Sequence, residues 1–295
     1  MARHRPVISF VLGSFNRRRF LKAAIESIRD NSITVPYEII VVDGGSNDGS
    51  LGWLSQQKDV ITIIQHNRGS FSGQAVKKRS WGYFMNLGFK CAQGKFILML
   101  SDDCLLVPGT VMNSVNLFQK LVAEGRRIAA VAFYWRNWPT MKDYWVGLTF
   151  GDKMFVNHGM YLRSALEKVD WIDEERYQFY HADGDLCLKL WNEGYEVVDC
   201  PDAFVEHFAH ANPCVRQSNL LPQKADWQAY QDRWSGIFPV NSGGWIHRSY
   251  NDPYNTARRF PRRERALMQW RRIIEYQKSV LPDFTLLRKS KNIKK

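Results

Sequence analysis

The sequence lacks any apolar run of the roughly 20 residues that a bilayer-spanning helix needs, so no such helix is expected. Its opening segment, MARHRPVISFVLGSF, lacks the small-residue cleavage site of a signal peptide, and we expect no secretory leader. Cysteine is scarce: the five thiols are odd in number and have no paired spacing, which argues against a disulfide framework. These absences together predict a cytoplasmic protein with reduced thiols.

Excess positive charge is nearly missing from the first 257 residues. The chain has a net charge of +12, but residues 258–295 hold 13 Lys and Arg against 3 acidic residues, which leaves +2 for the remainder. A nucleic-acid binder would interleave basic and aromatic residues over a folded face. The distribution therefore argues against nucleic acid as a partner.

The basic segment 258–295 is predicted to form a helical tail. Leu267, Trp270 and Ile274 fall at helical spacing among arginines, as in an amphipathic helix that lies on an anionic membrane surface. Periodicity alone equally allows a helix packed on its own domain. Peripheral attachment to the cytoplasmic membrane face and packing on the domain both stay open.

Apolar runs alternate with helical patterns through the first hundred residues. The predicted strands cover 6–15, 37–45, 60–67 and 94–100, and the predicted helices between them include 17–31 and part of 75–92. This alternation is typical of an α/β fold with a mostly parallel central sheet flanked by helices. Ligands of such sheets bind at the carboxyl ends of the strands, so the turns that follow the strands are the place to seek chemistry.

The second half is less regular. A helix is predicted over 108–124, a strand over 126–135, a helix within 181–194 and one or two strands within 195–210. We therefore expect one domain over 1–212, then a loop-rich, Trp-containing region over 213–257, then the tail over 258–295.

Acidic residues follow two of the predicted strands. Asp43 ends the second strand just before two glycines, which let a ligand approach the backbone. Asp102 and Asp103 end the fourth strand in ILMLSDDC, and adjacent carboxylates suit a hard divalent cation such as Mg²⁺ or Mn²⁺. Two solvated turn residues are the commoner use of an isolated Asp pair. The strand-end position and the partners that follow favour the metal.

Those partners lie late in the chain. Asp183 and Asp185 begin a predicted helix in HADGDL, where a carboxylate can be held as a general base, and His207 ends a late strand in VEH. Asp185 is equally suited to cap the helix.

This set of motifs resembles the family 2 glycosyltransferases, which are inverting enzymes with a GT-A fold, over about residues 6–210. The counterparts here are SFN after the first strand, VVDGGSNDGS, Asn86 with Gly88, GKFILMLSDD, ADGDLCLKLWNEGY and VEH, in the family's order. The resemblance implies a donor-binding half over about 1–104 and an acceptor half over about 105–212. It also implies a nucleotide-sugar donor, such as a UDP-, dTDP- or GDP-sugar, and a glycan, lipid-linked or other hydroxyl acceptor.

The resemblance further implies a role for each matching residue. Ser14, Phe15 and Asn16 would contact the nucleotide, with Phe15 against the base, and Asp43 would accept a hydrogen bond from it. Asp102 would lie near the ribose and the metal, and Asp103 would bind the Mn²⁺ or Mg²⁺ ion that holds the diphosphate. His207 would be a further metal or diphosphate contact, and Asp183 the base that deprotonates the acceptor.

Two departures from the family pattern matter. Ala182 replaces the first acid of the late motif, which leaves Asp185 or His181 open as the base, and DGG replaces the usual DDG after the second strand. The basic stretch before the third predicted helix includes Arg79, which is either a diphosphate contact or a solvated side chain.

Two rival interpretations carry less weight. A dinucleotide-binding or other α/β nucleotide enzyme would need a glycine-rich loop after the first strand, and GSFNRRR has a single glycine. A glycosyltransferase-like chain that binds without turning over satisfies the same motifs and stays open.

Overall fold

The computed structural model describes residues 5–67, 69–209, 219–240 and 243–280. The chain forms two compact units, 1–257 and 258–295. In the second unit, helix α9 (Arg262–Val280) carries Leu267 and Trp270. The side chain of Ile274, and residues 281–295, lie outside the described part of the chain. None of the described helices combines the length and the apolar character needed to cross a bilayer.

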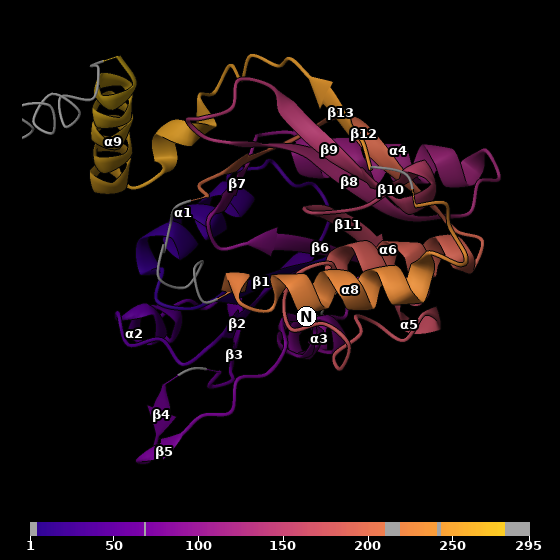
Figure 1. Cartoon of the computed structure of the whole chain (residues 1–295), viewed down its shortest axis with the longest axis horizontal. Helices are drawn as coiled ribbons and strands as arrows, with labels where there is room; N and C mark the ends of the chain where they lie inside the picture. Colours follow the sequence, from indigo (N-terminus) through magenta and orange to yellow (C-terminus); the bar gives the residue numbers. More distant parts are fainter. Residues whose placement is uncertain (1–4, 68, 210–218, 241–242, 281–295) are drawn as a thin grey trace, which may run out of the picture. The chain divides into compact units, whose positions relative to one another are not determined.

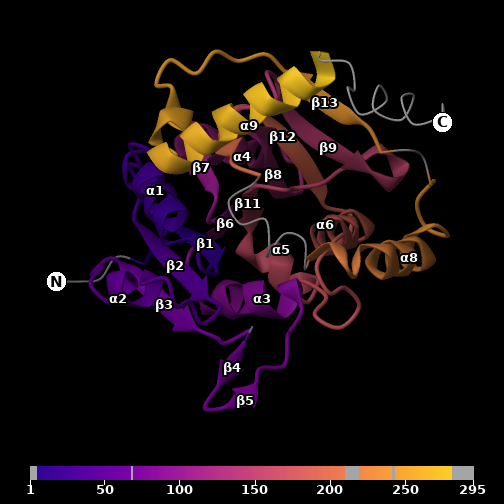
Figure 2. The same cartoon turned by 60° about the vertical axis from the view of Figure 1, so that its left-hand side comes forward.

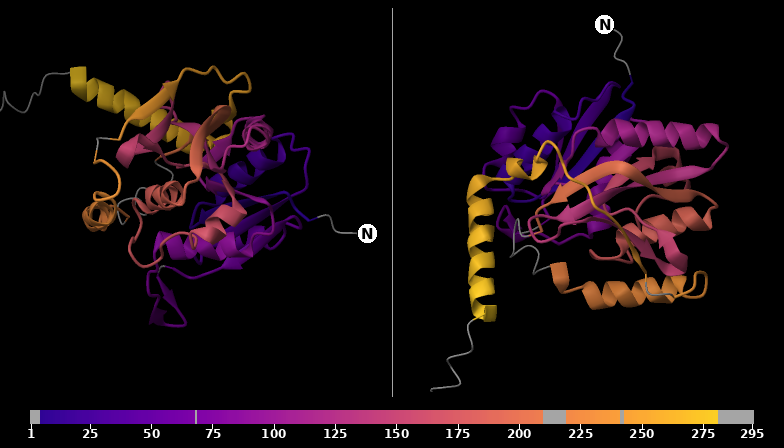
Figure 3. Two further views of the ribbon diagram at one scale, coloured as in Figure 1. Left: turned by 90° about the vertical axis from the view of Figure 1, so that its right-hand side faces the viewer. Right: turned by 90° about the horizontal axis from the view of Figure 1, so that it is seen from above.

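Four parallel strands form the first half of the central sheet, as the sequence predicts. Across the sheet they run β3 (Val60–Ile64), β2 (Tyr37–Asp43), β1 (Ile8–Ser14) and β6 (Phe96–Ser101). They are joined by α1 (Arg18–Arg29), by α2 (Ser50–Leu54), and by a short hairpin, β4 (Ser70–Phe71) with β5 (Gln74–Ala75), followed by α3 (Trp81–Cys91). The hairpin projects from the body of the unit (Figure 3).

The inner strands are apolar on both faces because helices cover both sides. Phe10 and Leu12 point into one core while Val11 between them points into the other. Helices α1, α2 and α4 (Thr110–Ala123) cover the first face, and α3, α5 (Arg163–Lys168), α6 (Ala182–Asn192) and α8 (Gln223–Trp234) cover the second (Figures 1 and 2). This two-sided burial explains why these strands read as continuous apolar runs.

The second half of the sheet is antiparallel in part, so the sheet is mixed rather than parallel throughout. Its further strands are β7 (Cys104–Leu106), β8 (Ile128–Asn137), β9 (Tyr144–Thr149), β10 (Lys153–Met154), β11 (Gly159–Leu162), β12 (Glu196–His207) and β13 (Trp245–Arg248). Strand β11, which the sequence analysis does not predict, lies antiparallel between β6 and β8. Two short 3₁₀ turns, Phe150–Asp152 and Thr256–Arg259, complete the elements.

The prediction of a loop-rich region over 213–257 is wrong for its described part. Residues 223–234 form helix α8, whose Tyr230 and Trp234 are buried in the core, and β13 pairs with β9. The first compact unit therefore runs to residue 257, beyond the boundary expected at 212.

Candidate active site

Strand register brings the late histidine to the aspartate pair. Strand β12 runs antiparallel to β7, with His207 opposite Cys104, and the Phe208 N–H donates to the Asp103 carbonyl at 2.9 Å. On its other side β12 runs parallel to β8 and places His207 opposite Asn137. Residues about a hundred positions apart thus meet at one edge of the sheet.

Arg17, at the start of α1, neutralises the aspartate pair. Its Nη1 donates to Asp102 Oδ1 at 2.7 Å and to Asp103 Oδ2 at 2.9 Å. Burial raises the pKa of Asp102 to about 6, against the opposing effect of Arg17. Burial also acts to raise the pKa of Asp103, but Arg17 and His207 outweigh it and hold that pKa well below the usual range. Asp103 therefore stays ionised to lower pH than Asp102 does.

The donor set beside Asp103 fits a divalent cation. His207 Nδ1 lies 2.7 Å from Asn137 Oδ1, an acceptor, so Nε2 is the ring nitrogen that faces Asp103 Oδ1, 3.6 Å away. Asp102 Oδ2 is buried and has no hydrogen-bond partner among the described residues. Cys104 lies within 4.8 Å of the same ligand atoms, but burial raises the pKa of its thiol well above the usual value. Oxygen and imidazole ligands remain, which suit Mn²⁺ or Mg²⁺.

Asp183 shares a cavity with this cluster. The cavity, of about 370 Å³, is lined by Asp103 and His207 on one side and by Asp183 and His181 on another. Asp183 lies in the first turn of α6, accepts from the Gly184 N–H at 2.9 Å, and accepts from Asn157 Nδ2 at 3.2 Å. Burial raises the pKa of Asp183. A raised pKa brings a carboxylate closer to the range of a general base.

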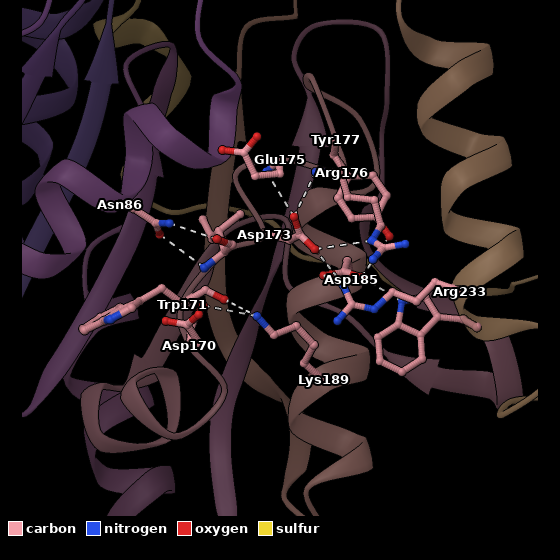
Figure 4. A network of polar contacts seen from close by, with 12 residues as sticks. Asn86, Asp170, Trp171, Asp173, Glu175, Arg176, Tyr177, Asp185, Lys189 and Arg233 are labelled. Atoms are coloured by element: carbon pink, nitrogen blue, oxygen red, sulfur yellow. Dashed lines mark hydrogen bonds and ion pairs between the residues drawn. The ribbon is translucent and has the colours of Figure 1, made fainter.

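Asp185, one of the alternatives for the base, is committed to the core. It is fully buried, accepts from Tyr177 Oη and Trp234 Nε1 at 2.9 and 2.8 Å, and pairs with Arg233 at 3.0 Å (Figure 4). It lines none of the cavities described in this section. His181, the other alternative, begins α6 with a left-handed backbone, and burial lowers its pKa.

A second cavity, of about 160 Å³, opens beside the first at the ends of β1 and β2. Ser14, Phe15, Gly44, Arg79 and Asp102 line it, with Trp81 and Phe84 from α3. Arg17 lines both cavities and so lies at their junction. An aromatic-lined pocket next to a metal-binding pocket is suited to a nucleotide whose diphosphate reaches the metal.

Asp43 and Asn16, both predicted to contact the donor, bond to the loops that follow β1 and β2. Asp43 accepts from the backbone N–H groups of Gly45 and Ser46 at 2.9 and 2.7 Å and from Ser46 Oγ at 2.7 Å. Asn16 Oδ1 accepts from the Asn47 N–H at 2.8 Å. Neither lines the second cavity. Both side chains hold the two loops that shape it.

A third cavity, of about 450 Å³, lies on the far side of Asp183. Its lining is aromatic: Phe150, Phe155, Trp227, Tyr230 and Trp245, with His181 and Asp183 among its polar groups. Among the described residues that line it, none is Lys or Arg. Asp183 thus stands between the metal-binding cavity and an aromatic, cation-free one.

Comparison with known proteins now gives the family. A family model described as "Glycosyl transferase family 2" matches residues 9–170, more than half of the chain. The chain belongs to glycosyl transferase family 2. The matched segment of this family 2 chain contains the aspartate pair but ends before Asp183 and His207.

Curated relatives match over shorter stretches. A dolichyl N-acetyl-alpha-D-glucosaminyl phosphate 3-beta-D-2,3-diacetamido-2,3-dideoxy-beta-D-glucuronosyltransferase of Methanococcus voltae is 26% identical over 127 residues, 42% of this chain and 37% of that protein. The putative teichuronic acid biosynthesis glycosyltransferase TuaG of Bacillus subtilis is 27% identical over 108 residues, 35% of this chain and 38% of TuaG. The matches span less than two fifths of either relative.

Solved structures confirm the α/β, GT-A fold expected from the family resemblance. TarS of S. aureus superposes with a TM-score of 0.52 at 14% identity, over 68% of this chain and 36% of TarS. The mannosyltransferase PcManGT from Pyrobaculum calidifontis, in complex with GDP-Man and Mn2+, superposes with a TM-score of 0.50 at 15% identity, over 70% of this chain and 57% of PcManGT. At such identities the likeness shows the fold alone.

Sequence reasoning misses several residues of this family 2 site. Arg17 is one of three consecutive arginines, and the sequence does not indicate which of the three pairs with the aspartates. Asn137 and Asn157, which orient His207 and Asp183, lie in segments with no recognisable motif. The one available signal is for Asn137, since it lies two residues beyond the apolar strand predicted over 126–135.

Proposed function

We propose that this protein transfers a sugar from a nucleoside-diphosphate donor to a hydroxyl acceptor, with inversion at the anomeric carbon. One observation carries the proposal: Asp103, His207 and Asp183 line one cavity, which adjoins the second cavity, near Asp102, and the third, aromatic cavity. The family membership supports the same reaction class.

Asp103 and His207, with Asp102, are the residues that would hold a divalent ion, Mn²⁺ or Mg²⁺. Bound there, the ion supplies positive charge that stabilises the departing diphosphate. The presence of Mn2+ in the PcManGT complex supports a metal in this fold. Arg17, between the two carboxylates, adds a second positive charge at the entrance to the nucleotide pocket.

Asp183 is the proposed base. Its buried carboxylate takes the proton of the acceptor hydroxyl as the acceptor oxygen attacks, and the hydrogen bond from Asn157 holds it in place. A single displacement with the base opposite the leaving group inverts the anomeric centre, unlike mechanisms with two carboxylates and a glycosyl-enzyme intermediate. Asp185 is assigned to the scaffold because its oxygens are already bonded within the core.

The donor is proposed to be a UDP-, dTDP- or GDP-sugar. Phe15 and Ser14 line the pocket for the nucleotide, together with Arg79. Solved structures of the same fold support this class, since TarS 1–349 is in complex with UDP and PcManGT with GDP-Man. Asp43 and Asn16 contribute by shaping the loops around the pocket.

The acceptor is proposed to be a glycan or lipid-linked glycan that presents a neutral sugar ring. The faces of Trp227 and Trp245 in the third cavity suit such a ring, and its described lining offers no cation for a phosphate. We further propose that the basic tail 258–295 attaches the protein to an anionic membrane surface on the cytoplasmic side.

Asp183→Asn tests this assignment. The variant should bind Mn²⁺ and nucleotide as the wild type does, since its charge lies across the cavity, while the rate of transfer falls by about 100-fold or more. In the wild type the rate should fall with decreasing pH as the base becomes protonated. Since burial raises the pKa of Asp183, this fall should begin above the usual carboxyl range. Transfer by the variant at the wild-type rate would show that another residue is the base.

A further inference from the structure

Helix α8 directs one buried carboxylate at the backbone of a neighbouring segment. Asp226, in its first turn, is 2% exposed. Its oxygens accept from three consecutive backbone N–H groups: Gln178 to Oδ1 at 2.9 Å, and Phe179 and Tyr180 to Oδ2 at 2.9 and 2.8 Å. Three backbone N–H groups that point at one carboxylate form an anion-binding site, and here the bound anion is a side chain of the same protein.

The segment held this way lies between the two cavities of the proposed donor site. Gln178 and Phe179 line the nucleotide pocket, while Phe179, Tyr180 and His181 line the cavity that contains Asp183. On its other side the segment is tied to α3, because the Trp81 N–H donates to the Gln178 carbonyl at 2.9 Å. Asp183 follows the last held residue by only three positions.

Asp226 is not what attaches α8 to the domain. Seven residues later on the same helix, Arg233 pairs with Asp173 at 2.9 Å and with Asp185 at 3.0 Å (Figure 4). Trp234 donates to Asp185 and is itself buried, as is Tyr230. These contacts anchor the helix, so the carboxylate of Asp226 is available for a separate purpose.

We infer that Asp226 is a positioning residue: it fixes the backbone of 178–180 and thereby sets the place of Asp183 relative to the donor. The inference rests on the proposed function. Asp226 itself lines none of the three cavities and acts only through the segment that it holds.

Asp226→Asn is the direct test, because the amide keeps the size of the side chain but loses the charge and turns an NH₂ group toward N–H donors. We expect kcat for transfer to fall by about tenfold or more, as misplacement of a reacting group does, while KM for the donor changes less. Backbone amides of 178–180 should exchange hydrogen faster, and those within α8 should not. Asp226→Glu should recover part of the rate.

Asp232→Asn is the matched control, since Asp232 is exposed on the same helix and accepts a hydrogen bond from Gln228 of that helix. This variant should leave unchanged both kcat for transfer and the rate at which the backbone amides of 178–180 exchange hydrogen. Wild-type kcat in Asp226→Asn, or faster exchange along the whole of α8, would overturn the inference. A wild-type protein that neither transfers nor hydrolyses a nucleotide sugar would overturn the proposed function, and the exchange experiment would still decide the role of Asp226.

Discussion

Arg17 is the residue on which the charge of the site depends. Its guanidinium is the positive group that pairs with both Asp102 and Asp103, and all three side chains are largely buried. A cation that enters the site must either share the two carboxylates with this guanidinium or displace it. Arg17 therefore couples the stability of the fold to the binding of metal.

Arg17→Gln should lower the free energy of unfolding at neutral pH by about 3–5 kcal/mol, the usual cost of removing one partner of a buried ion pair. The lowered pKa of Asp103 contributes stability above the carboxyl pKa of the unfolded chain, and that contribution is lost as pH falls through the folded value. The deficit of the variant should thus be largest near pH 7 and shrink below about pH 4. Urea unfolding across this pH range measures it.

A second experiment measures the melting temperature of both proteins with and without Mn²⁺. Mn²⁺ should raise the melting temperature of Arg17→Gln more than that of the wild type, because the ion restores the missing charge without competing with the guanidinium. Arg19→Gln, an exposed position on the same helix, is the control. An equal Mn²⁺ effect in both proteins would show that Arg17 and the metal do not share the aspartates.

At the scale of elements, the close approach of α3 to the sheet defines one wall of the nucleotide pocket. Gly88 of α3 lies so near the sheet that a Cβ there would come within 2.5 Å of Val11 Cγ1 on β1 and 3.1 Å of Val42 Cγ2 on β2. Only glycine allows this spacing. Trp81 and Phe84, on the same helix, depend on it for their place in the pocket.

Gly88→Ala should therefore destabilise the protein by about 1–3 kcal/mol, as overpacking does. Gly52→Ala on α2 is the matched control, since a Cβ there meets nothing within 4 Å and alanine favours a helix by up to about 1 kcal/mol. Chemical denaturation compares the two. A Gly88→Ala variant as stable as the wild type would contradict the close packing of α3 on β1.

Elements with a strong apolar period are predictable from the sequence, and those held by polar contacts are not. Strands β1, β2 and β6 have uninterrupted apolar runs because both faces are covered. Strand β11 has four residues and begins with Gly159, so it leaves no such pattern. Helix α8 buries only Asp226, Tyr230 and Trp234. Asp226, which holds the backbone of 178–180, and Arg233, which anchors the helix, are indistinguishable in sequence from solvated residues.

The residues of the site likewise divide into those that stand in a sequence motif and those that are placed by tertiary contacts. Asp102, Asp103, Asp183 and His207 can be named in advance because each stands in a motif at the end of a strand or the start of a helix. The structure then brings Asp103, Asp183 and His207 to one cavity, and Asp102 lines the adjoining one. What orients them, namely Arg17, Asn137 and Asn157, is set by tertiary register and leaves no local signal.

At the scale of the whole molecule, the compact unit 1–257 contains both cores and every residue of the candidate site. The basic tail should add membrane affinity rather than stability, since each Lys or Arg near an anionic surface contributes about 1 kcal/mol. Removal of 258–295 should abolish sedimentation with anionic vesicles while the melting temperature changes little. Wild-type binding should also weaken with salt. If the truncated protein unfolds, the tail is instead a packed part of the domain.

In the proposed reaction, Asp103 binds the divalent ion that the transfer of sugar from a nucleotide donor requires. The most direct measurement is the release of nucleoside diphosphate from a panel of UDP-, dTDP- and GDP-sugars by the purified protein with Mn²⁺ or Mg²⁺. We expect release with at least one donor, abolished by EDTA and by Asp103→Ala, and retained in Asp59→Ala, which changes an exposed aspartate on the surface. Undiminished release in EDTA, or by Asp103→Ala, would contradict this expectation.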